Sequence, residues 1–324
     1  MTTIERTKVL VEKVTDLLGH KDCVYTVKHS ADSKYIYSGA GEGWLARWNT
    51  DTYEGDRVLA QAGASIYAIA EDTITKTLWI GQKQGIVHII DIDKQTHVKS
   101  IQVSSMPVFC IEIDPRQNFV FVGTGDGYLS IFNLIDYKLM YHIRLAQPQA
   151  NLKNIRSIAI SQNTSHVAVA CSDQNIYILD SASHFKVIHT LQGHTNSVFC
   201  VKYSPCENYL LSGSRDARLK IWNVKQSYTL YQDIVAHLFA INDIVFDPQG
   251  QYFATASADK TIKIWDANTF MLLKVIDRAR NQSHFTSVNK LSWHKHLISC
   301  SDDKTIMVWN LNFIKPQQDT QKVA

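Results

Sequence analysis

Short runs in which apolar and polar residues alternate recur along the chain, and each run ends in a polar turn. Residues 197–203, Ser-Val-Phe-Cys-Val-Lys-Tyr, form one such run, and residues 204–208, Ser-Pro-Cys-Glu-Asn, form the turn after it. Alternation over short runs between turn residues predicts the strands of an antiparallel meander. No segment of about ten or more residues keeps a helical spacing of apolar positions between capping residues, so we expect almost no helix.

This meander returns seven times along the chain. Each unit closes on an apolar or aromatic residue followed by Asn or Asp: Trp48-Asn49, Ile90-Asp91, Phe132-Asn133, Leu179-Asp180, Trp222-Asn223, Trp265-Asp266 and Trp309-Asn310. The successive spacings are 42, 42, 47, 43, 43 and 44 residues. A fixed period of this length is typical of repeat architectures. We therefore predict one domain over residues 1–314, with repeats at about 19–60, 61–102, 103–146, 147–192, 193–235, 236–277 and 278–314.

Four of the units carry a more specific signature, in which a His precedes the closing Trp. The pairs are His20 with Trp48, His194 with Trp222, His237 with Trp265, and His284 with Trp309. In this the chain resembles the WD40-repeat family, and the resemblance covers nearly the whole sequence. Units two to four keep the spacing without the Gly-His and the Trp. The resemblance implies an all-β fold, a seven-bladed WD40 β-propeller with four antiparallel strands per blade.

The ring needs one further strand to close. Residues 11–17 precede Gly19-His20 as residues 187–191 precede Gly193-His194, so we predict that a strand at about 8–17 is the outer strand of the last blade. An open ring would leave two apolar blade faces exposed. The polar residues 315–324 are expected to be disordered. The excess length of the fourth unit falls at 146–154, which is either a loop grafted for function or a neutral insertion.

Polar residues at fixed register look catalytic but are better explained as structural. They are His20, Ser38 and Trp48 in the first unit, His194, Ser212, Asp216 and Trp222 in the fifth, His237, Thr255, Asp259 and Trp265 in the sixth, and His284, Ser299, Asp303 and Trp309 in the seventh. A Ser-His-Asp set can support nucleophilic catalysis, but three copies argue against one active site. The family implies instead a hydrogen-bond chain from Trp through Ser or Thr to His and Asp. Glu42 replaces the Asp of the first unit, so we expect that chain to be incomplete.

The family also implies a binding surface on the end face that surrounds the central channel. Residues at the start of each innermost strand, or in the turn before the repeat Asp, reach that face: Tyr25, Tyr67, Lys83, Phe109, Arg156, Phe199, Arg215, Asn242, Asn289 and Asp302. Aromatic residues and Arg carry much of the binding energy at protein interfaces. The set suits an extended peptide with an apolar anchor and an acidic group. The alternative is that these aromatic residues only line the channel.

Composition narrows the classes of function. The 324 residues carry 33 Lys and Arg against 30 Asp and Glu, a net charge of +3, which is too small to predict a nucleic acid or membrane partner. No apolar run reaches about 18 residues, and the first residues are charged, so we expect a soluble cytoplasmic protein. The six cysteines never form Cys-x-x-Cys and are read as buried thiols. We expect no metal and no cofactor.

Three functions follow from this sequence. The first is a non-catalytic scaffold that binds a peptide or protein partner within a larger complex and is itself monomeric. The second is a propeller-borne enzyme of the metal-assisted hydrolase type, which would need several carboxylates or histidines to converge. The third is a single-stranded RNA-binding propeller, in which aromatic side chains stack on bases. We expect the first.

Overall fold

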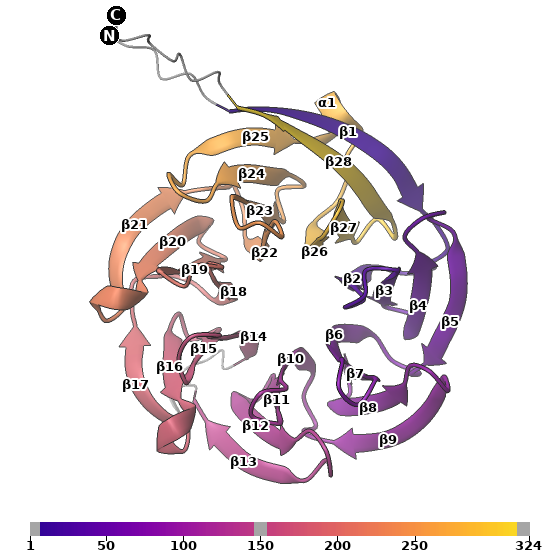
Figure 1. Ribbon diagram of the computed structural model, residues 1–324, viewed down its shortest axis with the longest axis vertical. Coiled ribbons are helices and arrows are strands. Elements are labelled where there is room, and N and C mark those ends of the chain that lie inside the picture. Colours follow the sequence, from indigo (N-terminus) through magenta and orange to yellow (C-terminus); the bar gives the residue numbers. More distant parts are fainter. Residues whose placement is uncertain (1–6, 146–153, 316–324) are drawn as a thin grey trace, which may run out of the picture.

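A computed structural model describes residues 7–145 and 154–315 of the chain. Its strands form seven four-stranded antiparallel sheets arranged as blades around a central opening (Figure 1). The prediction of a seven-bladed β-propeller is therefore confirmed. Most of the loop at 146–154 and nearly all of the C-terminal segment at 315–324 lie outside the described residues.

Six blades are built from four consecutive strands, with the first strand of each at the channel and the last at the rim (Figure 1). The first three blades contain β2 (Val24–His29), β3 (Tyr35–Ala40), β4 (Trp44–Asn49) and β5 (Gly55–Gln61); β6 (Ile66–Asp72), β7 (Thr77–Gln82), β8 (Ile86–Asp91) and β9 (Thr96–Gln102); and β10 (Val108–Asp114), β11 (Phe119–Thr124), β12 (Tyr128–Asn133) and β13 (Leu139–Arg144). The next three contain β14 (Ile155–Ile160), β15 (His166–Cys171), β16 (Ile176–Asp180) and β17 (Lys186–Leu191); β18 (Val198–Tyr203), β19 (Tyr209–Ser214), β20 (Arg218–Asn223) and β21 (Thr229–Val235); and β22 (Ile241–Phe246), β23 (Tyr252–Ser257), β24 (Ile262–Asp266) and β25 (Leu272–Ile276).

The seventh blade joins the two ends of the described chain. It contains β26 (Val288–Trp293), β27 (Leu297–Ser301) and β28 (Ile306–Ile314), and β1 (Lys8–Leu17) pairs with β28 as its outer strand. The register runs from Lys8 opposite Ile314 to Leu17 opposite Ile306. The predicted closure by an N-terminal strand is confirmed.

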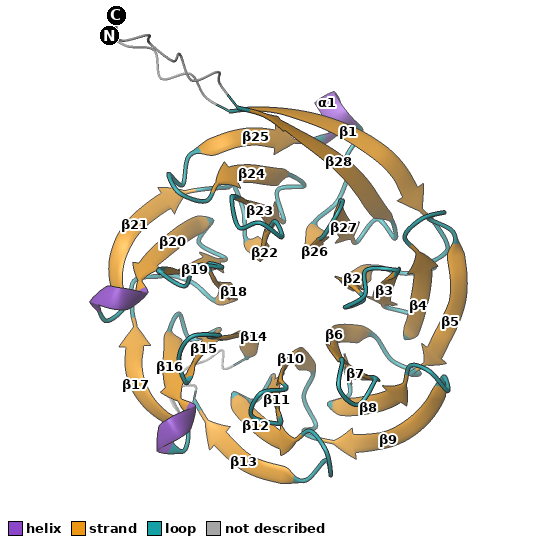
Figure 2. Ribbon diagram, viewed as in Figure 1, coloured by secondary structure: helices purple, strands orange, loops and turns teal. Residues whose placement is uncertain are grey.

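Helix is almost absent from the part of the chain that the structure describes (Figure 2). One α-helical turn, α1 (Arg278–Asn281), precedes the last blade, and two 3₁₀ turns occupy Ser181–Ser183 and Val224–Gln226. None of these described helices has the length and apolar character required to cross a bilayer.

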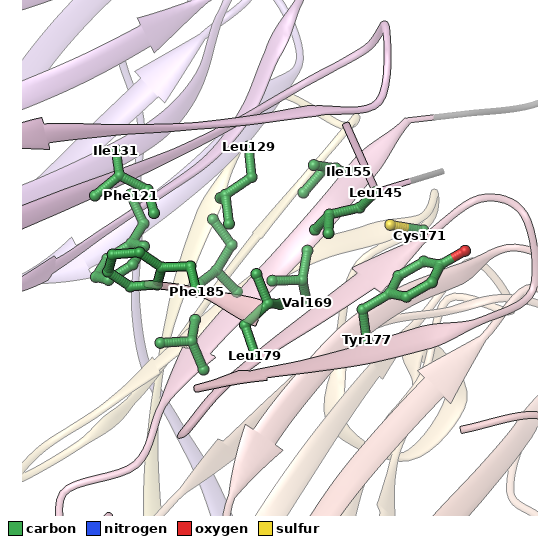
Figure 3. Packing of buried hydrophobic residues seen from close by; sticks show 12 residues of the cluster. Phe121, Leu129, Ile131, Leu145, Ile155, Val169, Cys171, Tyr177, Leu179 and Phe185 are labelled. Atoms are coloured by element: carbon green, nitrogen blue, oxygen red, sulfur yellow. The ribbon is translucent and has the colours of Figure 1, made fainter. Parts of the chain in front are cut away.

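The hydrophobic core lies between blades rather than in one central mass. Seven clusters of buried side chains each join two neighbouring blades. Figure 3 shows the cluster between the third and fourth blades, where Phe121 and Leu129 meet Val169, Leu179 and Phe185. Each fully buried side chain of this size contributes roughly 1.5–3 kcal/mol relative to exposure. Every blade therefore depends on both of its neighbours.

Close approach of blades explains glycines in the second strands. A Cβ on Gly123 would lie 2.4 Å from Cγ2 of Ile155 in the next blade, and one on Gly213 would lie 2.6 Å from Cγ2 of Ile241. Real Cβ atoms do not come this close to another carbon. These glycines therefore allow a β-branched residue of the following blade to pack directly on the strand.

Hydrogen-bond chains run from the buried Trp residues of four blades toward the surface. In the fifth blade, Nε1–H of Trp222 donates to Oγ of Ser212 at 2.9 Å, and that hydroxyl lies 2.8 Å from Nε2 of His194. Nδ1 of His194 lies 2.9 Å from Oδ2 of Asp216. A carboxylate only accepts, so Nδ1 carries the hydrogen and Ser212 donates to Nε2. The sixth and seventh blades have the same contacts: Trp265, Thr255, His237 and Asp259, and Trp309, Ser299, His284 and Asp303.

The first blade differs from the expectation of an incomplete chain. Oε1 of Glu42 lies 2.6 Å from Nδ1 of His20, and Nε2 of His20 lies 2.7 Å from Oγ of Ser38. Nε1–H of Trp48 donates to the same hydroxyl at 2.8 Å. The longer side chain of Glu42 thus reaches the histidine that an Asp contacts in the other blades, and the chain is complete.

Candidate functional site

All seven innermost strands share a local irregularity that faces the channel. In each, the pairing with the second strand shifts register at the second residue: Tyr25, Tyr67, Phe109, Arg156, Phe199, Asn242 and Asn289. A β-bulge leaves one residue unpaired and redirects its side chain. Seven bulges at one level therefore carry seven side chains to the same end of the channel.

These side chains line a single cavity of about 350 Å³, here called the mouth. Its lining is Tyr25, Tyr67, Phe109, Arg156, Phe199, Asn242, Asn289, Lys290 and Asp302. Eight of the ten residues predicted for the binding face thus lie together. This prediction was based on equivalent positions in the seven repeats rather than on any local motif.

Aromatic rings form a continuous arc on one side of the mouth. The rings of Tyr25 and Tyr67 meet edge-to-face with centroids 4.9 Å apart, and Tyr67 stacks on Phe109 at 5.7 Å. Both separations fall in the range of favourable aromatic pairs. Burial raises the pKa of both Tyr25 and Tyr67, so their hydroxyls stay protonated at neutral pH. The arc is a flat, half-buried apolar wall with hydroxyl groups that can still donate.

Arg156 continues this arc with a positive charge. Its guanidinium carbon lies 4.3 Å from the ring centre of Phe109 and 4.5 Å from that of Phe199. Such contacts are attractive because the ring faces carry negative charge. Burial lowers the pKa of Arg156, although the group remains charged because an Arg pKa starts so high.

Side-chain amides occupy the other side of the mouth and link neighbouring blades. Nδ2 of Asn242 donates to the carbonyl of Val288 at 2.8 Å, and Nδ2 of Asn289 donates to that of Val24 at 2.9 Å. Nδ2 of Asn289 also lies 2.7 Å from Oδ1 of Asp302. These bonds fix the amides, so this side of the mouth is polar and well ordered.

Lys290 lines the mouth but was not predicted from the sequence. Its Nζ lies 2.9 Å from Oδ1 of Asp243. Burial opposes its charge, but the carboxylate of Asp243 outweighs that effect and raises the pKa of Lys290. Its position, one residue after the bulge at Asn289, could have been found only by knowing that the bulge shifts the strand.

Two predicted residues do not line the mouth. Lys83 lies in a neighbouring cavity with Ser65 and Gln102, and the exposed Arg215 contributes no atom to the mouth lining. Both occupy the turn between the second and third strands, one layer farther from the channel. Asp302 has the same position in its blade but is held toward the mouth by its bond to Asn289.

Three carboxylates in the inner strands, those of Asp243, Glu71 and Glu112, have separate surroundings and do not converge. Asp243 binds Lys290, and Oε2 of Glu71 accepts from the backbone N–H of Ala31 at 2.8 Å. Glu112 lines a different cavity together with Lys202. Within residues 7–145 and 154–315, no three His, Cys, Asp or Glu side chains are arranged to hold a metal ion.

Comparison with known proteins places the chain among repeat proteins. The sequence profile of the family described as "WD domain, G-beta repeat" matches residues 11–49, 185–223, 228–266 and 278–310. These segments contain all residues of the four complete hydrogen-bond chains. The second and third blades, and most of the fourth, lie outside the matched segments.

Three relatives illustrate the similarity. The chain is 22% identical to "Periodic tryptophan protein 2 homolog" of Mus musculus over 228 residues, which is 65% of this chain and 24% of the relative. It is 26% identical to "Striatin" of Mus musculus over 251 residues, 71% of this chain and 32% of the relative. It is 33% identical to "Nuclear distribution protein PAC1" of Candida tropicalis over 133 residues, 40% of this chain and 26% of the relative. The aligned segments thus span between 24% and 32% of the length of these relatives.

Proposed function

Because the chain belongs to the WD40-repeat family and folds as a seven-bladed β-propeller, we propose that it is a non-catalytic protein-interaction scaffold. In this proposal the mouth binds an extended segment of a partner protein within a larger complex. Six free thiols suit a role in the reducing cytoplasm.

The observation that carries this proposal is the composition of the mouth. Four aromatic rings and one arginine from five different blades line one open cavity. Aromatic residues and Arg are enriched among residues that dominate interface energetics, and the aromatic side chains lose little conformational entropy on binding. The polar residues with catalytic appearance are instead tied to buried Trp side chains, as at Ser212 and Trp222.

A quantitative capture experiment tests this role. The tagged full chain is used to recover partners from its native cells, and the purified partner segment is then titrated directly against the chain. The variant Tyr67→Ala/Phe199→Ala removes two walls of the mouth and should reduce partner recovery by about tenfold or more, in keeping with loss of an interface anchor. The matched control is Tyr231→Ala on β21, a 56% exposed aromatic residue at the rim.

Equal recovery by the mouth variant and the control would overturn the proposal, provided that both variants melt at the wild-type temperature. Recovery that disappears after nuclease treatment would support single-stranded RNA binding instead. A steep loss of affinity with salt would accompany that outcome, since phosphate contacts release counterions.

A further inference from the structure

The charge of Arg156 has no opposite charge beside it. Its guanidinium carbon lies close to the rings of both Phe109 and Phe199. Among the residues that the structure describes, no carboxylate or other hydrogen-bond acceptor contacts it, so its N–H groups are not used within the described chain. A guanidinium held in this way can bind a carboxylate through two parallel hydrogen bonds.

Two other shielded cations among the described residues each have a carboxylate partner. Lys290 pairs with Asp243 inside the same mouth, and the buried Lys220 pairs with Asp233 near the rim. A shielded charge without a partner costs free energy that a ligand of opposite charge would recover. Arg156 therefore points to an anion supplied from outside the chain.

An unpaired carboxylate, Asp302, lies on another part of the mouth, and a second one, Asp22, lies close to it outside the mouth lining, at the junction of the last and first blades. Asp302 is half-buried and accepts from Nδ2 of Asn289, but no described Lys, Arg or His forms an ion pair with it. Asp22, at the entry to β2, is exposed and also has no ion pair among the described residues. The pKa of Cys23, which lies between them in the fold, is raised by burial and then by both carboxylates. The two carboxylates thus create a negative electrostatic potential at the Cys23 thiol.

The two charges face each other across the channel. β14, which carries Arg156, and β26 and β27, which lead to Asp302, lie on opposite sides of the central opening (Figure 1). Both side chains line the same cavity, with the aromatic arc between them along one wall. The mouth therefore has a positive pole and a negative pole.

We propose that the mouth selects an extended peptide segment of both charges, with an Asp or Glu carboxylate at Arg156 and a Lys or Arg cation at Asp302. This inference rests on the proposed function, because it specifies the partner of the same site. A segment of one sign satisfies one pole and is repelled by the other, which is how like charges exclude wrong partners. The aromatic arc takes an apolar side chain between the two charged residues.

Selection from a random peptide library tests the inference without the native partner in hand. A phage-displayed library of nonapeptides is panned against the full chain, against Arg156→Gln and against Asp302→Asn. On the wild-type chain, the enriched peptides should carry one acidic and one basic residue at a fixed separation, in the range of about two to six residues for an extended segment. Panning on Arg156→Gln should lose the acidic preference alone, and panning on Asp302→Asn should lose the basic preference alone.

Direct titration measures how much peptide affinity each substitution removes. The enriched peptide, made synthetically with a fluorescent label, should bind about tenfold more weakly to each variant, as for a lost charge-assisted hydrogen bond. Matched controls are Arg57→Gln on the outer strand β5 and Asp51→Asn in an exposed outer turn. Both should bind like the wild type. If Arg156→Gln does not fold, Arg156→Lys keeps the charge but lacks the planar fork, and it should retain the acidic preference at reduced affinity.

Two failures can be told apart. Enriched peptides of a single sign, or a charge preference that survives both substitutions, would overturn the bipolar inference. If Tyr67→Ala/Phe199→Ala still loses the native partner, the proposed function would stand. No enrichment on the wild-type chain, with native recovery unaffected by that mouth variant, would overturn both.

Discussion

A single hydroxyl holds together each hydrogen-bond chain. Oγ of Ser212 accepts from the indole of Trp222 and donates to His194, so both polar groups are satisfied by one atom. At the far end of the chain, burial works against the charge of Asp216, but the bond from His194 lowers its pKa to about 2. The carboxylate thus stays ionised and keeps the histidine oriented.

Replacement of this hydroxyl should be costly. In Ser212→Ala, the indole N–H of Trp222 and Nε2 of His194 both lose their partner inside the protein. We expect the free energy of unfolding to fall by about 1–3 kcal/mol for the groups left unsatisfied. Urea denaturation measures this change, with Thr195→Ala, an exposed neighbour of His194, as control. A loss no larger than that of the control would contradict the structural role.

A half-buried histidine should make the free energy of unfolding depend on pH. His29, at the end of β2, contacts Oγ of Ser292 in the last blade at 2.8 Å. Burial, followed by the charges of His294 and His296, lowers its pKa from 6.5 to about 4. The unfolded chain therefore takes up a proton that the folded chain excludes. The free energy of unfolding is therefore highest above pH 6.5. It falls as the pH is lowered toward 4, by up to roughly 3 kcal/mol for this group.

Thermal melting from pH 7 to pH 4 tests whether stability falls as the pH is lowered. The melting temperature of the wild type should fall over this interval, and it should fall less in His29→Gln, which keeps a polar group near Ser292. Thr96→Ala, an exposed substitution on β9, should follow the wild-type curve. Identical pH profiles for His29→Gln and the wild type would contradict the assignment.

At the scale of the element, β1 is a structural part of the ring. Leu17 is only 2% exposed and packs in the cluster that joins the last blade to the first, with Ile36 and Val308. Leu18, the residue directly after the strand, is 68% exposed. Successive side chains of an extended segment point to opposite faces, so these two neighbours differ completely in burial.

This contrast predicts a matched pair of variants. Leu17→Ala should lower the free energy of unfolding by about 2–5 kcal/mol, the cost of emptying a packed site. Leu18→Ala should change it by less than about 0.5 kcal/mol. Chemical denaturation of both variants gives the comparison. Equal effects would show that β1 does not hold the predicted register.

The glycines of the second strands supply another test at this scale. Gly213→Ala places a Cβ against Ile241 and should destabilise by about 1–3 kcal/mol through overpacking. In Gly55→Ala, the new Cβ meets Trp48 at 3.4 Å, an ordinary contact. That control should be neutral or slightly stabilising, since alanine restricts the unfolded chain. Calorimetric melting temperatures of the two variants should therefore move in different directions or by clearly different amounts.

The sequence predicted the ring because its period is carried by residues that every blade needs. The Trp residues and the spacing of turns fixed the number of blades, and the similarity of residues 11–17 to 187–191 located the closing strand. The mouth residues followed by counting from His194 and its equivalents. The β-bulges, however, leave no mark in an alternating pattern, so Lys290 was missed. The displacement of Lys83 and Arg215 from the mouth depends on side-chain contacts that register alone does not describe. The reach of Glu42 to His20 is likewise a matter of side-chain length.

At the scale of the whole molecule, the residues that stabilise the ring and the residues that are available for binding lie in different places. Hydrophobic clusters occupy the seven blade interfaces, and in four blades a hydrogen-bond chain satisfies the indole of the buried Trp. The mouth lies where those interfaces end, and there no element of the described residues covers the aromatic arc or the charge of Arg156. A rigid ring thus presents a preorganised surface, which reduces the entropy that a partner segment must lose on binding.

The pairing of β1 with β28 also sets an order for biosynthesis. β1 is made before every other described strand, while β28, its antiparallel partner, is made after the other six blades. Six blades can assemble in sequence, but the seventh must wait until nearly the entire described chain has emerged. During this interval the cluster around Leu17 has only one of its two sides, and apolar surface stays exposed to chaperones or to aggregation. A chain that stops before β28 would therefore keep an open seam between its last and first blades.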